Sequence, residues 1–225
     1  MKLRYLAIFS ILSFNLLTLV GCTKQSTQQI SHSQNQTAEY LYEEGSKYYL
    51  GEDIPQNYTK AFQLFEQSAQ QGLATAQNDL ASMYFAGLGT KQNYQKAFFW
   101  FEKAAEQNFP EAQYNLANAY LDGNGIIQDR NKALELYIKA AEQNFPRAQY
   151  NLANLYSEGS GVAKDEDKAL ELYIKAAEQN FPEAQYNLAY LYQYSFNDTK
   201  KAKFWYTKAK NNGIEEAKNA LAELN

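Results

Sequence analysis

The chain has 225 residues, with 21 Lys and Arg against 25 Asp and Glu, and a formal net charge of −4 at pH 7. Such a mildly acidic chain argues against nucleic acid and anionic lipid as partners of the folded part, because both are bound through an excess of Lys and Arg. It contains one cysteine, which excludes an internal disulfide, so the fold must rest on packing alone.

Two basic residues precede an apolar run over 5–20, which has the length of a signal-peptide core and is short for a membrane span of about 20 apolar residues. The run ends Leu19-Val20-Gly21-Cys22, which resembles the bacterial lipobox. This resemblance implies cleavage before Cys22 and attachment to the membrane through a lipidated Cys22. We therefore expect a lipoprotein signal peptide over 1–21. An ordinary signal peptide in which Cys22 is incidental remains the alternative.

Residue 23 is Thr rather than Asp. In Gram-negative lipoproteins Asp at this position usually signals retention in the inner membrane. The resemblance therefore implies a protein of the bacterial cell envelope, anchored in the outer membrane and facing the periplasm. Residues 23–37 are polar and lack periodicity, so we expect 22–37 to be a flexible tether. His32, the one histidine, lies in this tether, where a solvated side chain is expected rather than a catalytic residue or a metal ligand.

A 36-residue repeat dominates the rest of the chain. Between 109–144 and 145–180, 26 of 36 aligned positions are identical. A period in this range indicates a solenoid, in which each repeat buries its apolar face against its neighbours. We predict an all-α fold, a right-handed α/α solenoid of helix-turn-helix repeats over 38–213, followed by a capping helix over 214–225. The expected repeats are 38–72, 73–108, 109–144, 145–180 and 181–213.

Each repeat is expected to contain a first helix, a glycine loop and a second helix. Pro110 suits the first turn of a helix, and Leu116 and Tyr120 follow at the spacing of one buried helical stripe. Gly123 and Gly125 tolerate positive φ and should end the first helix. The predicted N-caps of the second helices are Asn57, Asn93, Asp129, Asp165 and Asp198. The predicted stops of the same helices are Gly72, Asn108, Asn144, Asn180 and Gly213.

The fifth repeat lacks both loop glycines, and Ser195-Phe196-Asn197 stands in their place. We expect a tighter or differently shaped turn at this point. The first repeat is also atypical, because Glu44 occupies the position of Leu116. Terminal repeats of a solenoid commonly differ from the inner ones, because one of their faces meets solvent.

The recurring pattern Ala-x-x-x-Leu-Ala-x-x-Tyr, x-x-Gly-x-Gly, Asp-x-x-Lys-Ala and a helix ending Ala-Ala-x-x-Gly/Asn resembles the Sel1-like repeat (SLR). That family forms α/α solenoids related to the tetratricopeptide repeat. Ala117 stands where the family usually has Gly, which is a mild departure. In the third repeat the matching residues are Ala112, Leu116, Tyr120, Gly123, Gly125, Asp129, Lys132, Ala133, Ala140 and Ala141.

The resemblance also points to a binding surface. In tetratricopeptide arrays the first helix of each repeat lines the concave face, and two positions there, four residues apart, avoid the buried stripe. Tyr supplies rigid contact area and Asn supplies a donor and an acceptor, so these positions suit an extended peptide or a protein loop. The alternative is that copying of the repeat preserved Tyr and Asn without a function. The candidate row consists of Tyr42, Asn78, Tyr114, Tyr150 and Tyr186 at the first position and Ser46, Ser82, Asn118, Asn154 and Tyr190 at the second.

The repeats offer no catalytic residues, no metal ligands and no cofactor site. They contain no His, so no Ser-His-Asp set can form, and their glycine loops lack the Lys-Ser/Thr of a phosphate-binding loop. Carboxylate pairs such as Asp165 with Asp167 sit at a helix start, where they meet the helix dipole favourably. We therefore expect no enzyme but a lipid-anchored envelope scaffold or adaptor that binds protein or peptide partners on its concave face.

Two other functions stay open. Some lipoproteins with these repeats are encoded beside secreted lipases or nucleases, so the chain could be an immunity protein that neutralises a secreted toxin. Other family members are Cys-rich and have been linked to β-lactam binding or hydrolysis. This chain lacks those cysteines, which places an enzyme acting on cell-wall or β-lactam substrates last.

Overall fold

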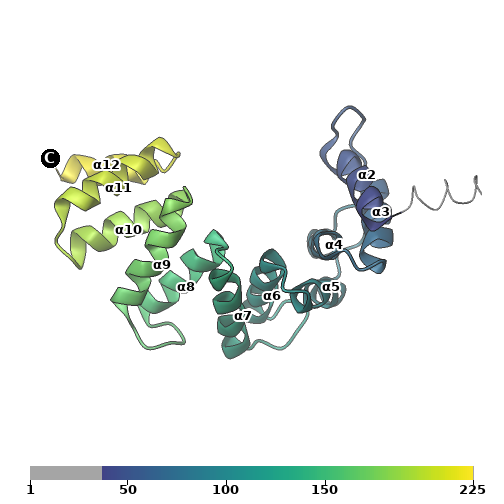
Figure 1. Cartoon of the computed structure of the whole chain (residues 1–225), viewed down its shortest axis with the longest axis horizontal. Coiled ribbons are helices and arrows are strands. Elements are labelled where there is room, and N and C mark those ends of the chain that lie inside the picture. The colour runs from purple at the N-terminus through teal and green to yellow at the C-terminus, as the bar shows by residue number, and fades with distance from the viewer. Residues whose placement is uncertain (1–36, 225) are drawn as a thin grey trace, which may run out of the picture.

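The computed structural model describes residues 37–224, which hold eleven helices and no strand (Figure 1). This confirms the predicted all-helical repeat solenoid. Within this range no helix is both long enough and apolar enough to span a lipid bilayer. The expected signal peptide, Cys22 and all but the end of the expected tether lie outside the described residues. The helices are α2 (Ala38–Leu50), α3 (Tyr58–Gln70), α4 (Ala74–Ala86), α5 (Tyr94–Glu106), α6 (Pro110–Asp122), α7 (Arg130–Glu142), α8 (Pro146–Glu158), α9 (Glu166–Glu178), α10 (Pro182–Tyr194), α11 (Thr199–Asn211) and α12 (Glu216–Glu223).

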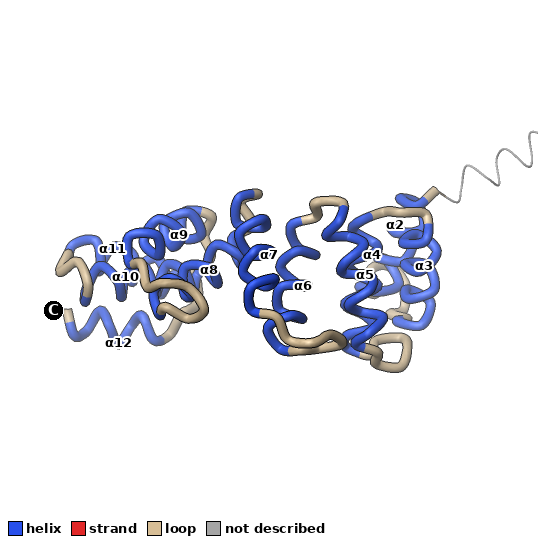
Figure 2. Tube along the Cα trace, turned by 90° about the horizontal axis from the view of Figure 1, so that it is seen from below, coloured by secondary structure: helices blue, strands red, loops and turns tan. Residues whose placement is uncertain are grey.

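Ten of these helices form five pairs, each a first and a second helix, and α12 closes the stack. Each helix packs against its partner in the pair and against the adjoining helix of the next repeat. Figure 2 shows the repeats following one another along one axis. In Figure 1 the stack bends into a crescent, in which the first helices α4 and α6 lie nearer the hollow than the second helices α5 and α7. The surface of the first helices that faces the hollow is called the inner face below.

The helix boundaries follow from local capping. Asn57, Asn93, Asp129, Asp165 and Asp198 all precede a second helix, and each side chain accepts a hydrogen bond from a backbone N–H of the first turn. Asn108, Asn144 and Asn180 take φ of 60–63° just beyond the second helices, and Gly72 and Gly213 take φ of 97° and 98°. The predicted starts and stops are therefore confirmed.

The turn in the fifth repeat differs as expected. Ser195 follows α10 with φ of −95°, whereas the glycines that follow α4, α6 and α8 take the left-handed conformation. Asn197 takes the positive φ instead, at 52°. The chain then reaches the N-cap Asp198 directly.

The second loop glycine allows two backbones to meet in repeats 2 and 3. A Cβ on Gly125 would lie 2.3 Å from the backbone oxygen of Tyr94, the first residue of α5. A Cβ on Gly89 would lie 2.1 Å from the equivalent oxygen of Tyr58. Gly161 in repeat 4 has the same positive φ but nothing within 4 Å. The loop of repeat 4 therefore stands away from the preceding repeat.

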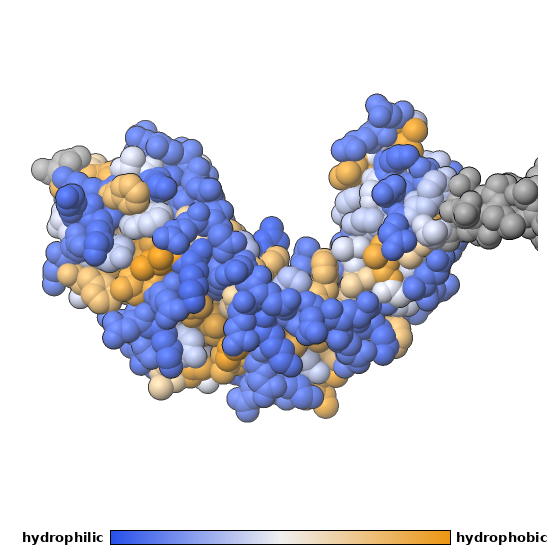
Figure 3. Space-filling model, viewed as in Figure 1, coloured by the Kyte–Doolittle hydropathy of each residue, from blue (hydrophilic) through white to orange (hydrophobic). Residues whose placement is uncertain are grey.

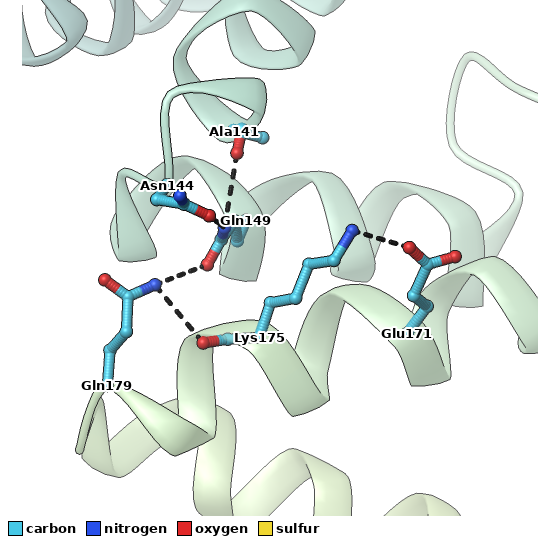
Figure 4. A network of polar contacts seen from close by, with 6 residues as sticks. All are labelled: Ala141, Asn144, Gln149, Glu171, Lys175 and Gln179. Atoms are coloured by element: carbon cyan, nitrogen blue, oxygen red, sulfur yellow. Dashed lines mark hydrogen bonds and ion pairs between the residues drawn. The ribbon is translucent and has the colours of Figure 1, made fainter.

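A buried glutamine in four of the first helices joins consecutive repeats. Gln149 is fully buried, and its Nε2 donates to the backbone oxygen of Ala141 at 3.2 Å and to Oδ1 of Asn144 at 3.4 Å (Figure 4). Its Oε1 accepts from Nε2 of Gln179 at 2.8 Å. Because every polar atom of this buried amide is paired, it fixes the register between the end of one repeat and the start of the next. The other buried members of the series are Gln77, Gln113 and Gln185.

Candidate partner-binding site

The tyrosines at the first position of the candidate row are half-buried and rest on other aromatic rings. Tyr114 packs against Tyr137 at 5.8 Å and Phe145 at 5.5 Å between ring centroids. Tyr150 packs against Phe181 at 5.3 Å. These contacts hold each ring in one orientation, with part of its surface left toward the hollow. The row is therefore rigid before any partner arrives.

The N-terminal end of the row is more enclosed. The hydroxyl of Tyr42 donates to Oδ2 of Asp79 at 2.8 Å, and burial, with the nearby Asp79 carboxylate, raises the pKa of Tyr42 to about 12. Asn78 is only 1% exposed, and its Oδ1 accepts from Nδ2 of Asn115 at 3.0 Å. Asn78 thus joins α4 to α6 and presents almost no surface of its own to a partner.

Asn118 and Asn154, at the second position, belong to hydrogen-bonded junctions between repeats. The side-chain oxygen of Asn154 accepts from the hydroxyl of Tyr173 at 2.5 Å and from Nδ2 of Asn187 at 3.1 Å. Tyr137 donates to Asn118 in the same way. Burial raises the pKa of Tyr173 to about 12, which keeps its phenol protonated as a donor. Each junction ties a first helix, its second helix and the next first helix, because Asn151 donates to the hydroxyl of Tyr137 at 3.3 Å and Asn187 donates to that of Tyr173 at 3.4 Å.

The C-terminal end of the row is open. Tyr190 is 52% exposed, and its ring lies 4.4 Å from that of Tyr194, which is 55% exposed. Together with Tyr186, these residues form a stripe along α10 at steps of four residues. Sequence reasoning did not identify Tyr194, although the step of four from Tyr190 is a signal that could have found it. This stripe is the most accessible aromatic surface of the inner face.

Pockets open on the inner face where consecutive first helices separate. One of about 410 Å³ lies among α8, α9 and α10 and includes Asn154, Tyr173 and Tyr190 in its wall. Another of about 310 Å³ lies in the equivalent place among α4, α5 and α6. The two pockets are two repeats apart and are lined by residues at equivalent positions of the repeat, such as Asn118 and Tyr190.

Two kinds of residue at this site were not predicted from the sequence, the tyrosines of the second helices and an asparagine next to the row. Tyr137 and Tyr173 on the second helices are buried at their rings but reach the inner face through their hydroxyls. Asn187 follows the predicted Tyr186 by one position and completes the junction. Their recurrence at 36-residue spacing was the available signal. Among residues 37–224 no group of three or more His, Cys, Asp or Glu side chains is placed to hold a metal ion.

The Sel1 repeat family model matches 31–73, 74–109, 110–145, 146–181 and 182–214, which together make up most of the chain. The chain belongs to the Sel1 repeat family. Proteins built from Sel1 repeats generally bind protein partners. No curated protein matches this Sel1 repeat protein.

Solved structures support the same assignment. A Sel1 repeat protein from Oxalobacter formigenes is 30% identical, with a TM-score of 0.77 over 81% of this chain and 76% of that chain. The protective antigen c5321 of uropathogenic Escherichia coli, which displays an SLR fold, is 31% identical, with a TM-score of 0.75 over 85% of this chain and 42% of that one. The immunity protein PA5088 from Pseudomonas aeruginosa is 24% identical, with a TM-score of 0.57 over 80% of this chain and 67% of that chain. The last likeness is one of fold alone.

Proposed function

We propose that this Sel1 repeat protein is a lipid-anchored scaffold of the bacterial envelope that binds a protein or peptide partner along its inner face. The observation that carries the proposal is the row of Tyr and Asn side chains held in place by bonds between repeats and ending in the exposed pair Tyr190 and Tyr194. Rigid aromatic groups give large contact area with little loss of conformational entropy on binding. A rigid, curved and partly aromatic surface therefore suits an extended segment or a protruding loop.

The anchor is supported by the sequence around Cys22. The apolar run over 5–20 and the residues Leu19 to Cys22 match what lipidation requires. Thr23 favours the outer membrane, with the repeats facing the periplasm. The polar residues up to 37 supply enough chain to hold the solenoid away from the lipid surface. The proposed partner is consequently a protein or peptide that reaches the periplasmic side of the envelope.

The test is to crosslink partners to the protein in intact envelopes and to compare the natural chain with the double variant Tyr190→Ser, Tyr194→Ser. Both side chains are more than half exposed, so their loss should leave the helical content unchanged. Tyr114 and Tyr150 are less suitable, because their rings support neighbouring rings. We expect the double variant to lose most of the specific crosslinks to the native partner.

A matched control exists on the second helices. Phe99 and Phe204 are 47% and 53% exposed and belong to α5 and α11, away from the candidate row. The double substitution Phe99→Ser and Phe204→Ser removes a comparable aromatic area from the outer layer. If this control loses the crosslinks and the Tyr190/Tyr194 variant keeps them, the binding face has been assigned wrongly.

An immunity function is the second candidate. It is favoured by the fold shared with the immunity proteins PA5088 and Pa5087 of Pseudomonas aeruginosa, at TM-scores of 0.57 and 0.58. This function would be a special case of the scaffold, with a toxin as the partner. The genes beside the one encoding this chain distinguish the two, because an immunity protein requires a cognate effector. Protection of cells against that effector, lost in the Tyr190/Tyr194 variant, would establish it.

A further inference from the structure

The two helix layers carry opposite charge. The six first helices, with α12 counted among them, contain ten acidic and three basic residues, a net charge of −7. The five second helices contain nine acidic and thirteen basic residues, a net charge of +4. The small net charge of the whole chain conceals this separation. The layer that borders the hollow is therefore strongly acidic, while the second helices with their N-caps Asp129, Asp165 and Asp198 carry a net charge of only +1 (+4 − 3).

Several of these carboxylates lie beside the candidate row and are not held in a direct ion pair. Within residues 37–224, Asp79, Glu111, Asp122 and Glu158 form no ion pair. Burial raises the pKa of Asp79, and burial together with the nearby Asp79 raises the pKa of Glu111, although the positive charge of Arg147 acts on Glu111 in the opposite direction. Carboxylates held close together in this way are stabilised by an incoming positive charge.

Carboxylates and exposed aromatic rings meet at the C-terminal end of the inner face. The pocket among α8, α9 and α10 has both Glu158 and Tyr190 in its wall. Burial and then the charges of Glu216 and Glu223 raise the pKa of Tyr186, so these carboxylates stand close to the same stripe. In Figure 3 the arm that holds these helices is mostly hydrophilic along its edge toward the hollow.

The basic side chain at the C-terminal pocket does not neutralise all of the carboxylates in its wall. Lys164 lies at the same pocket, but its Nζ pairs with Glu166 at 2.8 Å. Glu158 remains as the carboxylate in the pocket wall that no described cation neutralises. An aromatic wall beside a carboxylate is a favourable site for a Lys or Arg side chain, because the ring face and the carboxylate both attract positive charge.

We propose that the partner presents an extended, cationic segment to the inner face, and that one Lys or Arg side chain of it enters the pocket among α8, α9 and α10. This inference rests on the proposed function, whose partner it describes. The segment passes from the Asp79 end of the hollow to the stripe of Tyr186, Tyr190 and Tyr194. Charge complementarity along the whole path steers the segment and fixes its position.

The repeat suggests the spacing of the cationic residues. Packed helices lie about 10 Å apart, and a segment in the polyproline II conformation advances about 3.1 Å per residue with three residues per turn. Every third side chain of such a segment therefore faces the same side, at steps of about 9 Å that are close to the spacing of packed helices. A peptide of about 12 residues is long enough to pass about four first helices.

The experiment uses the full chain solubilised in a non-ionic detergent and labelled Gly/Ser peptides of about 12 residues, followed by fluorescence anisotropy. The probes carry Lys, Arg, Glu or Gln at every third position. We expect the Lys and Arg probes to bind, the Glu and Gln probes not to bind, and binding to weaken as salt is raised. Equal binding of the Gln probe would overturn the inference.

The substitutions Glu158→Gln and Glu223→Gln together should weaken binding of the Lys probe about fivefold. The substitutions Glu142→Gln and Glu178→Gln on the exposed surface of α7 and α9 change the net charge equally and should leave binding within about twofold. An equal loss in both double variants would refute the assignment to the inner face. If the native partner is captured through Tyr190 and Tyr194 while no cationic probe binds, the inference fails and the proposed function stands.

Discussion

Replacing Gly125 by Ala tests how the loops hold the stack together, and the chain supplies its own control. Gly125 and Gly161 occupy the same position in successive repeats, with φ of +81° and +77°. In both, Ala must adopt the left-handed conformation, which costs about 1–2 kcal/mol. At Gly161 this is the whole expected effect, because a Cβ there meets nothing within 4 Å.

At Gly125 a steric cost is added. The new Cβ would lie 2.3 Å from the backbone oxygen of Tyr94, 2.5 Å from its carbonyl carbon and 3.0 Å from the nitrogen of Gln95. These atoms belong to the backbone at the start of α5, so no side-chain rotation relieves the contact and the loop must move away. Forcing an extra methyl group into a packed site typically costs about 1–3 kcal/mol. We therefore expect Gly125→Ala to destabilise the protein by about 2 kcal/mol more than Gly161→Ala.

The assay is urea unfolding followed by helical circular dichroism, with hydrogen exchange of the loop over 123–129 as a local readout. The second readout is needed because repeat arrays do not always unfold in one step. Faster exchange in that loop should accompany the loss of stability in the Gly125 variant. Two variants that differ by less than about 0.5 kcal/mol in unfolding free energy would show that the loop contact contributes little.

Two further predictions concern protonation and anchoring. Burial raises the pKa of Tyr137 and that of Tyr173 to about 12, from about 10 in the unfolded chain. The contribution of the two protonated phenols to the free energy of unfolding is therefore complete below pH 10 and is lost as the pH rises toward 12. Urea midpoints measured across this range should fall more steeply for the natural chain than for a Tyr137→Phe, Tyr173→Phe variant, and parallel curves would contradict the assignment. Cys22→Ser should abolish incorporation of labelled fatty acid into the protein, whereas Ser33→Ala in the same segment should not. Absence of label from the natural chain, or equal labelling of the Cys22→Ser variant, would rule out the lipid anchor at Cys22.

The helix boundaries could be predicted because capping is local. Asp129 and Asn144 act within one turn of their own position, so the residue type is enough to recognise them. The burial of Gln149 could not be predicted in the same way. A Gln on a helix ordinarily indicates a solvent-facing position, and here it is enclosed because the end of the preceding repeat covers it. Its role depends on the angle between helices, which the periodicity of one helix does not contain.

The candidate row shows the same limit. Asn78 and Tyr114 share one position in the repeat, yet Asn78 is enclosed by its bond to Asn115, while the ring of Tyr114 remains partly accessible. Tyr190 is 52% exposed, whereas Asn118 and Asn154 at the same position of repeats 3 and 4 are partly buried. Periodicity predicted which positions share one face of the first helices. The degree of exposure at each position depended on neighbours one repeat away.

The joint between repeats also bears on how such a chain changes length. At the joint before repeat 4, Gln149 bonds to a backbone oxygen, that of Ala141, and the joint before repeat 5 uses Gln185 and Ala177 in the same way. A backbone oxygen is present whatever the side chain, so this bond of the joint needs no matched substitution in the preceding repeat. Whole repeats can therefore be gained or lost by duplication or deletion while this bond is kept. The 26 identical positions of the 36 in 109–144 and 145–180 fit such a duplication, which would also change the span of the hollow and the length of segment that it can hold.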